Sequence, residues 1–124
     1  MANLKYRDLT ATIIKCFYSV YNELGSGFLE KVYENAFCYE LQQNGLFVET
    51  QKKIHVFYKS QCVGEYFADR VVEDCIIIEL KVVRKLLDQH SAQLLNYLKA
   101  TSFEVGLLFN FGEDAEFKRM VLNK

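Results

Sequence analysis

Three residues, Asp69, Glu79 and Lys81, combine side-chain types and a spacing that suggest chemistry. Glu79 and Lys81 lie two positions apart in an apolar stretch, and this spacing places both side chains on one face of a β-strand. A hairpin with the preceding strand would bring Asp69 beside Glu79. Two carboxylates that share a site suit a hard divalent cation such as Mg²⁺ or Mn²⁺. A structural ion pair of Lys81 with either carboxylate accounts for the same spacing, since charged residues are common on strands.

Two further polar positions lie on predicted helices. Glu30 follows Gly27 by three positions, in the first turn of a helix, where a carboxylate also complements the helix dipole. Gln93 shares one helical stripe with His90 and Tyr97, and this pattern is equally typical of a hydrogen-bonded helix edge. For His90 we favour the helix-edge interpretation.

The elements that position these residues follow from the hydrophobic periodicity. Helical spacing predicts helices over residues 4–23, 28–44 and 88–101, and a period of two predicts strands over residues 54–58, 63–72, 75–82, 105–110 and 116–122. The apolar run at residues 76–78 indicates a central strand that is covered on both faces. The order α-α-β-β-β-α-β-β predicts an α/β fold, a mixed sheet flanked by helices, in one domain over residues 1–124.

Composition narrows the classes of protein. The chain has 124 residues, of which 51% are hydrophobic and 25% are charged, as in a soluble globular domain. No apolar run approaches the roughly 20 residues that cross a bilayer, so we expect no membrane association. Four widely spaced cysteines without a CxxC pair favour reduced thiols and a cytoplasmic location. The net charge of −1 does not by itself indicate nucleic-acid binding, which would need a local basic patch.

Residues 27–33 read Gly-Phe-Leu-Glu-Lys-Val-Tyr and match the pattern that names the GxxExxY proteins, small prokaryotic members of the PD-(D/E)XK nuclease-like superfamily. The resemblance continues in the family's order through residues 64–69, 78–81, 93–98 and 106–112, so it spans nearly the whole chain. It implies the superfamily's αβββαβ core, preceded here by an extra N-terminal helix.

The resemblance also implies roles for individual residues. The ligands to Mg²⁺ or Mn²⁺ would be Asp69, Glu79, Glu30 and the main-chain carbonyl of Leu80. Lys81 would be the motif lysine, which orients the attacking water or stabilises charge on phosphorus. Gln93 would be the helix glutamine that often accompanies the carboxylates. The implied catalytic set is therefore Asp69, Glu79, Lys81, Glu30 and Gln93.

Two positions depart from the family pattern. Ala68 stands where the superfamily has proline, and Arg70 stands where an aliphatic residue is expected. A cation beside Asp69 would perturb the site or contact phosphate. Together with Arg84 and Lys85, Arg70 would supply the missing basic patch, although a solvated charged turn explains these cations equally well.

The function that the resemblance implies is a metal-dependent nuclease that hydrolyses phosphodiester bonds of DNA, with a homodimer addressing two strands. Two other classes remain open. A nucleic-acid-binding or regulatory module would retain the fold without efficient cleavage, since a fold does not establish a function. A self-associating structural protein would use the aromatic first helix as its interface.

Overall fold

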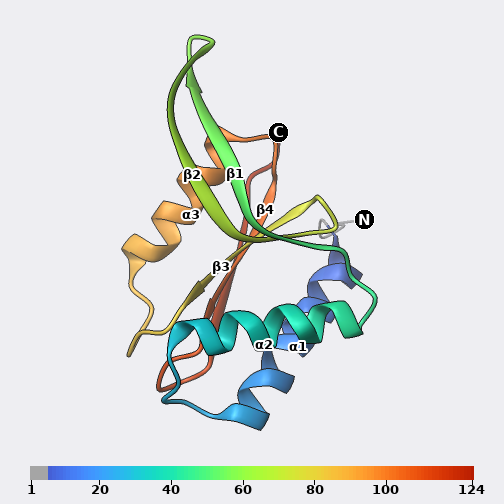
Figure 1. Ribbon diagram of the computed structural model, residues 1–124. Coiled ribbons are helices and arrows are strands. Elements are labelled where there is room, and N and C mark those ends of the chain that lie inside the picture. The colour runs from blue at the N-terminus through green and yellow to red at the C-terminus, as the bar shows by residue number, and fades with distance from the viewer. Residues whose placement is uncertain (1–5) are drawn as a thin grey trace.

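The computed structural model describes residues 6–124 as three helices and five strands (Figure 1). The elements are α1 (Arg7–Leu24), α2 (Glu30–Gln43), β1 (Val48–Tyr58), β2 (Gln61–Val72), β3 (Ile76–Lys81), α3 (Asp88–Ala100), β4 (Val105–Asn110) and β5 (Glu116–Val121). Their order is the predicted one. The start of the first helix, predicted at residue 4, lies outside the described residues. Strand β1 begins six residues earlier than predicted, because its polar first half has no apolar alternation and is recognisable only by its pairing with β2.

The five strands form one sheet in the order β1-β2-β3-β4-β5. Strands β3 and β4 run parallel and every other neighbouring pair is antiparallel, so the sheet is mixed, as predicted. Strand β3 lies in the middle, and residues 76–78 are completely buried. Helix α3 makes the crossover between the two parallel strands, which a hairpin cannot join.

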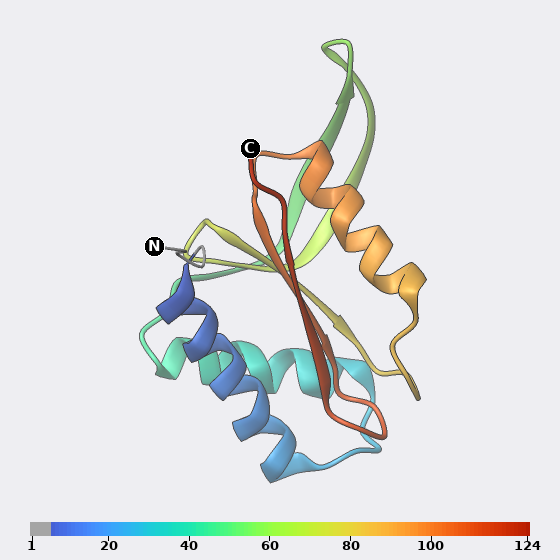
Figure 2. The same ribbon diagram turned by 180° about the vertical axis from the view of Figure 1, so that it is seen from behind.

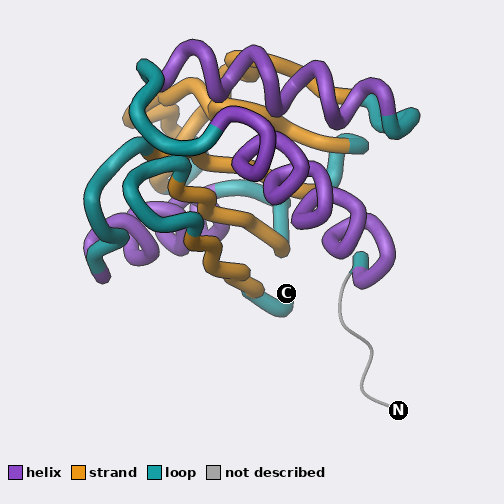
Figure 3. Tube along the Cα trace, turned by 90° about the horizontal axis from the view of Figure 1, so that it is seen from below, coloured by secondary structure: helices purple, strands orange, loops and turns teal. Residues whose placement is uncertain are grey.

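Helices cover both faces of the sheet. Helices α1 and α2 pack on one face and α3 on the other, with the strands between them (Figures 2 and 3). Phe17 of α1 anchors the first layer, with its ring centroid 4.6 Å from that of Phe109 and 4.7 Å from that of Phe111. The apolar face of α1 is therefore part of the intramolecular core, which removes the reason for expecting it to be an interface.

The β1–β2 hairpin extends beyond the rest of the sheet. Strand β2 pairs with β1 along its length but with β3 only over its last three residues, Arg70–Val72. Gln51 has a φ of 53° and the register shifts between Val56 and Phe57, so the two strands twist strongly. The tip of the hairpin projects clear of the helices (Figures 1 and 2). Asp69 lies at the point where β2 separates from β3.

Candidate active site

The structure brings Asp69 and Glu79 together. The β2–β3 register reaches Arg70 opposite Ile78, and just beyond it the Oδ2 atom of Asp69 accepts a hydrogen bond of 2.8 Å from the Leu80 N–H. The aspartate side chain thus replaces the strand partner that Leu80 loses where the strands diverge. The Glu79 carboxyl lies close enough to the Asp69 side chain for Asp69 to raise the pKa of Glu79. The Asp69 carboxylate thus fixes the end of the β2–β3 pairing, and the Glu79 carboxyl lies against it.

This carboxylate pair is electrostatically unfavourable when both groups are ionised. Burial raises the pKa of Glu79 from 4.5 to about 9, with a second contribution from the charge of Asp69. Lys81 lowers the pKa of Glu79 but only partly offsets these effects. The Oε1 atom of Glu79 is buried and has no hydrogen-bond partner within residues 6–124. The pair therefore cannot ionise fully near neutral pH without additional positive charge, and it has an unused oxygen acceptor.

Glu30 belongs to the same electrostatic cluster. Burial raises the pKa of Glu30, and the neighbouring carboxylates of Glu34 and Asp69 raise it further, whereas Lys81 lowers it. In the described part of the chain, however, no three His, Cys, Asp or Glu side chains already converge closely enough to hold a metal ion. Glu30 thus adds negative charge near Asp69, but its side chain does not converge with those of Asp69 and Glu79 on one metal position.

Tyr33 explains the spacing within residues 27–33. Its side chain is completely buried and its ring stacks on Phe111 at 4.8 Å. Its hydroxyl donates a hydrogen bond to the carbonyl of Gly25 and accepts one of 3.2 Å from the Phe28 N–H. The tyrosine thus fixes the loop that enters α2, and Glu30, one turn earlier on the same helix, is held at the start of that helix.

Arg70 is buried and is not part of a surface patch, contrary to the expectation that it joins Arg84 and Lys85. Only 4% of Arg70 is exposed. Its guanidinium donates to the carbonyl of Asp69 and, at 3.2 Å, to the carbonyl of Glu34, and it lies 3.7 Å from the Glu34 carboxylate. Arg70 therefore ties β2 to α2 beside the carboxylates. Arg84, by contrast, is exposed and pairs with Glu113 at 3.4 Å.

Gln93 reaches the site through two tyrosines that the sequence did not single out as a pair. Gln93 donates a hydrogen bond of 2.8 Å to the hydroxyl of Tyr97, whose ring stacks on Tyr66 with centroids 3.6 Å apart. Burial and the charge of Glu79 raise the pKa of both phenols. The Tyr66 hydroxyl is buried with no hydrogen-bond partner among residues 6–124. His90 accepts a hydrogen bond from the Leu87 N–H at the start of α3, as expected of a helix-edge residue.

Asn110 supports the segment that follows Lys81, a role that no pattern in the sequence indicates. The side chain is completely buried and forms hydrogen bonds with both the N–H and the carbonyl of Val83, and with the N–H of Gly112. A Cβ atom on Gly112 would lie 1.7 Å from the Val83 carbonyl oxygen. The contacts of Asn110 and Gly112 hold the segment after β3 in place, and this accounts for these two residue types at these positions.

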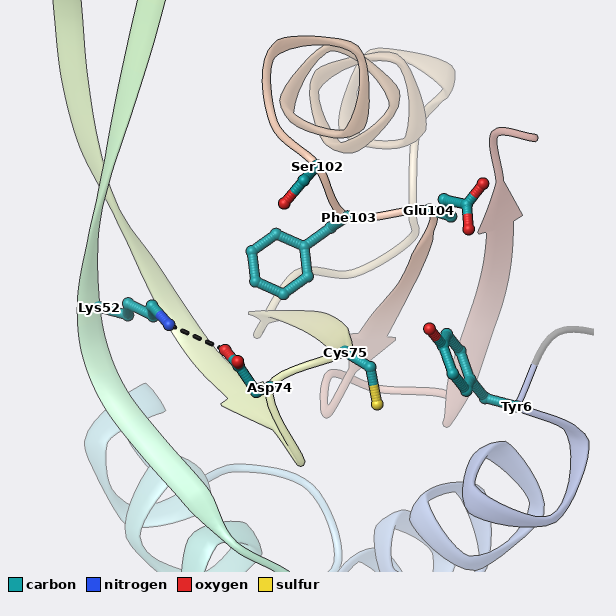
Figure 4. Close-up of a pocket in the computed structure, with 7 residues that line it drawn as sticks. All are labelled: Tyr6, Lys52, Asp74, Cys75, Ser102, Phe103 and Glu104. Atoms are coloured by element: carbon teal, nitrogen blue, oxygen red, sulfur yellow. Dashed lines mark hydrogen bonds and ion pairs between the residues drawn. The ribbon is translucent and has the colours of Figure 1, made fainter. Parts of the chain in front are cut away.

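A cavity of about 310 Å³ lies at the other end of β3, away from Glu79 and Lys81 (Figure 4). It is lined by Tyr6, Lys52, Asp74, Cys75, Ser102, Phe103 and Glu104. Within it, the Lys52 ammonium lies 3.0 Å from the Asp74 carboxylate, so the two charges neutralise each other. This cavity does not include the carboxylates of the candidate site.

The fold and the site define a class of protein: an α/β domain in which an aspartate, a glutamate and a lysine meet at the end of the central strand of a mixed sheet. The sequence matches the PD-(D/E)XK nuclease superfamily over residues 7–120, and the chain belongs to this superfamily. Among solved structures, the crystal structure of SSO0001 is similar, with a TM-score of 0.58 and 21% sequence identity.

The similarity to SSO0001 covers 76% of this chain and 50% of that one, so this chain spans about half the length of that structure. At this level of identity the likeness concerns the fold. Comparison with curated proteins gave no match. None of the helices within residues 6–124 is long and apolar enough to cross a membrane.

Proposed function

We propose that the protein is a metal-dependent nuclease of the GxxExxY type that hydrolyses phosphodiester bonds of DNA. The observation that carries this proposal is the buried pair of Asp69 and Glu79 beside Lys81, in which a carboxylate oxygen of Glu79 has no partner. Two ionised carboxylates with a free buried acceptor are costly unless a cation completes the site. Membership of the nuclease superfamily gives the same expectation for the chemistry.

The residues present fit a hard divalent cation. Asp69 and Glu79 would hold it through carboxylate oxygens, with Glu30 and the Leu80 carbonyl as further ligands. A bound Mg²⁺ or Mn²⁺ supplies Lewis-acid polarisation of a phosphate and lowers the pKa of a bound water. Binding of the cation would also lower the pKa of Glu79, because a nearby positive charge favours the ionised carboxylate.

The chain's own residues have separate roles in this proposal. Lys81 places a cation beside the carboxylates, where it orients a water or stabilises negative charge that develops on phosphorus. Arg70 and Glu34 hold the strand with Asp69 against the helix with Glu30. Gln93 fixes the Tyr97 ring, which with Tyr66 forms an aromatic wall beside Glu79.

A non-catalytic nucleic-acid-binding or regulatory module is the second candidate. The observation that favours it is the absence, within residues 6–124, of three ligand side chains already arranged around a metal position. In such a module, Glu79 would keep its proton at neutral pH and Asp69 would serve only to hold the Leu80 N–H. The two candidates differ in whether a divalent metal binds.

Calorimetric titration with Mn²⁺ tests the proposal without a choice of substrate. We expect the wild type to bind Mn²⁺ and both Asp69→Ala and Glu79→Ala to lose this binding, whereas Glu113→Ala, an exposed carboxylate outside the site, retains it. Cleavage of DNA and RNA in Mg²⁺ then identifies the substrate. An absence of Mn²⁺ binding by the folded wild type, with and without DNA, would favour the regulatory module.

The proposal includes further properties of the molecule. A homodimer would place two sites on two strands, and sedimentation velocity measures this directly. A single domain over residues 1–124 and a cytoplasmic location are part of the same proposal. All four cysteines are free thiols, which agrees with a reducing compartment.

A further inference from the structure

The projecting half of the β1–β2 hairpin, residues 53–67, exposes large apolar side chains; we refer to this segment as the hairpin arm. The exposed fractions are 61% for Phe57, 61% for Tyr58, 60% for Val63 and 54% for Phe67. Leaving such side chains in water forfeits about 25 cal/mol for each Å² that could be buried. Several of them on one projecting element are typical of an interaction surface.

The two faces of the hairpin arm have different surroundings. Ile54 and Tyr66 pair across the strands and pack in the core layer of α3. Strand alternation therefore turns their neighbours, Lys53 and Phe67, to the opposite face, where they also form a cross-strand pair. His55 lies farther along this face, and its ring centroid is 6.2 Å from that of Phe57. The open face thus carries aromatic rings in succession along the ribbon.

Ammonium groups accompany the exposed rings of the arm, one on the open face and one near the tip. The Lys53 Nζ atom lies 5.9 Å from the centre of the Phe67 ring, and the Lys59 Nζ atom lies 5.3 Å from the centre of the Tyr58 ring. Glu65 pairs across the strands with His55, and its carboxylate lies 3.7 Å from the Lys53 ammonium and 3.3 Å from the His55 ring. With two lysines against this one carboxylate, and with His55 neutral, the arm carries a net charge of +1, whereas the whole chain carries −1. This projecting aromatic segment is therefore also locally positive.

Aromatic rings interleaved with cations match one class of ligand, single-stranded nucleic acid. Unpaired bases stack on exposed rings while their phosphates attract the lysines, and each stacked base contributes about 1–3 kcal/mol. A duplex buries the faces of its bases within its own stack, so it cannot use the rings in this way. Phe67 lies two residues before Asp69 on β2, so a strand stacked along the arm leads toward the candidate site.

We propose that the hairpin arm is a stacking platform for single-stranded nucleic acid and guides it to Asp69 and Glu79. The guidance rests on the proposed nuclease function, whereas the binding does not. Fluorescence anisotropy of a labelled oligothymidine, measured in EDTA so that no cleavage occurs, tests the binding alone. The informative variants are Phe57→Ala with Phe67→Ala, and Lys53→Ala. Tyr39→Ala is the matched control, since Tyr39 is 63% exposed but lies on α2.

We expect the double phenylalanine variant to bind the oligothymidine at least about tenfold more weakly than the wild type, with a smaller loss for Lys53→Ala and no change for Tyr39→Ala. A matched duplex should bind more weakly than the single strand. Circular dichroism establishes that each variant is folded; a double variant that fails to fold is replaced by Phe57→Ser alone, at a site that is mostly exposed.

Three results would overturn the proposal: equal affinity of the folded variants and the wild type, no binding of the oligothymidine by the wild type, or a wild-type dimer that the arm variants dissociate. Failure of the nuclease proposal has a different signature. In that case Mn²⁺ binding and cleavage are absent in the wild type, while oligothymidine binding and its loss in the arm variants persist.

Discussion

Replacing Glu79 by glutamine is expected to stabilise the protein in the absence of divalent metal while removing its response to metal. Glu79 has a pKa of about 9 in the folded protein against an ordinary value of 4.5. Between these values the folded state binds a proton that the unfolded state lacks, so stability falls as the pH rises through this range. Each pH unit above 4.5 lowers the free energy of unfolding by about 1.4 kcal/mol, so by pH 7 the cost of the raised pKa of Glu79 has an upper limit of about 3 kcal/mol.

Glutamine keeps the shape of the side chain and needs no proton, so we expect Glu79→Gln to exceed the wild type by about 1–3 kcal/mol at pH 8 in EDTA and by little at pH 5. Urea unfolding at both pH values measures this difference. In excess Mn²⁺ we expect the wild type to become the more stable protein, since a bound ligand stabilises only the protein that binds it. This stabilisation amounts to about 2.7 kcal/mol at a Mn²⁺ concentration of one hundred times the Kd.

The control is Glu113→Gln, which replaces an exposed carboxylate and should change stability by less than about 0.5 kcal/mol at either pH. The reasoning would be refuted if Glu79→Gln were less stable than the wild type at pH 8 in EDTA. It would also be refuted if the difference between the two proteins did not grow with pH, because a protonation effect must change across this range.

Three further predictions concern the residues around this pair. Arg70→Met keeps much of the volume but leaves the half-buried Glu34 with only the exposed Lys31 ammonium at 3.8 Å, so we expect a loss of about 1–3 kcal/mol in urea unfolding, and the double change with Glu34→Gln should recover part of it. Tyr66→Phe removes an unpartnered buried hydroxyl and should keep or raise stability, whereas Tyr97→Phe removes the hydrogen bond with Gln93 and should cost about 1 kcal/mol; the opposite order would contradict the assignment of these partners. Gly112→Ala places a methyl group against a backbone carbonyl and should lower stability by about 1–3 kcal/mol, and an unchanged melting temperature would show that this loop yields freely.

The sequence predicted the order of the elements because each leaves a local signature. The helical stripe of α1 and the alternation in β2 record which side faces the core, and the apolar run of β3 records burial on both faces. The first half of β1 leaves no such signature. All of its residues after Val48 are polar, and only the pairing with β2 identifies this segment as a strand. The mixed sheet followed from the element order alone, since a helix between β3 and β4 permits them to run parallel.

The candidate site was visible in the sequence because the spacing of Glu79 and Lys81 along one strand places them on one face and a hairpin brings Asp69 beside Glu79, and the resemblance named the same residues. Arg70 was not predictable in this way. In the sequence, a cation next to an acidic residue suggests a surface contact for phosphate. The fold instead places Arg70 against Glu34, which lies 36 residues earlier on α2. Likewise, Gln93 contacts Tyr97 as helical spacing suggests, whereas the stacking of Tyr97 on Tyr66 joins elements that are distant in the chain.

The sequence by itself determined the elements, their order, the superfamily motifs and the candidate residues of the proposed metal site. Each of these depends on interactions between near neighbours or on patterns along one element. Only the tertiary structure decided that Asp69 holds the end of β3 through the Leu80 N–H, that Glu79 is buried against it, and that the hairpin leaves its aromatic face open. Burial, and the pKa that follows from it, depend on everything that surrounds a side chain in space, and a single strand does not contain that information.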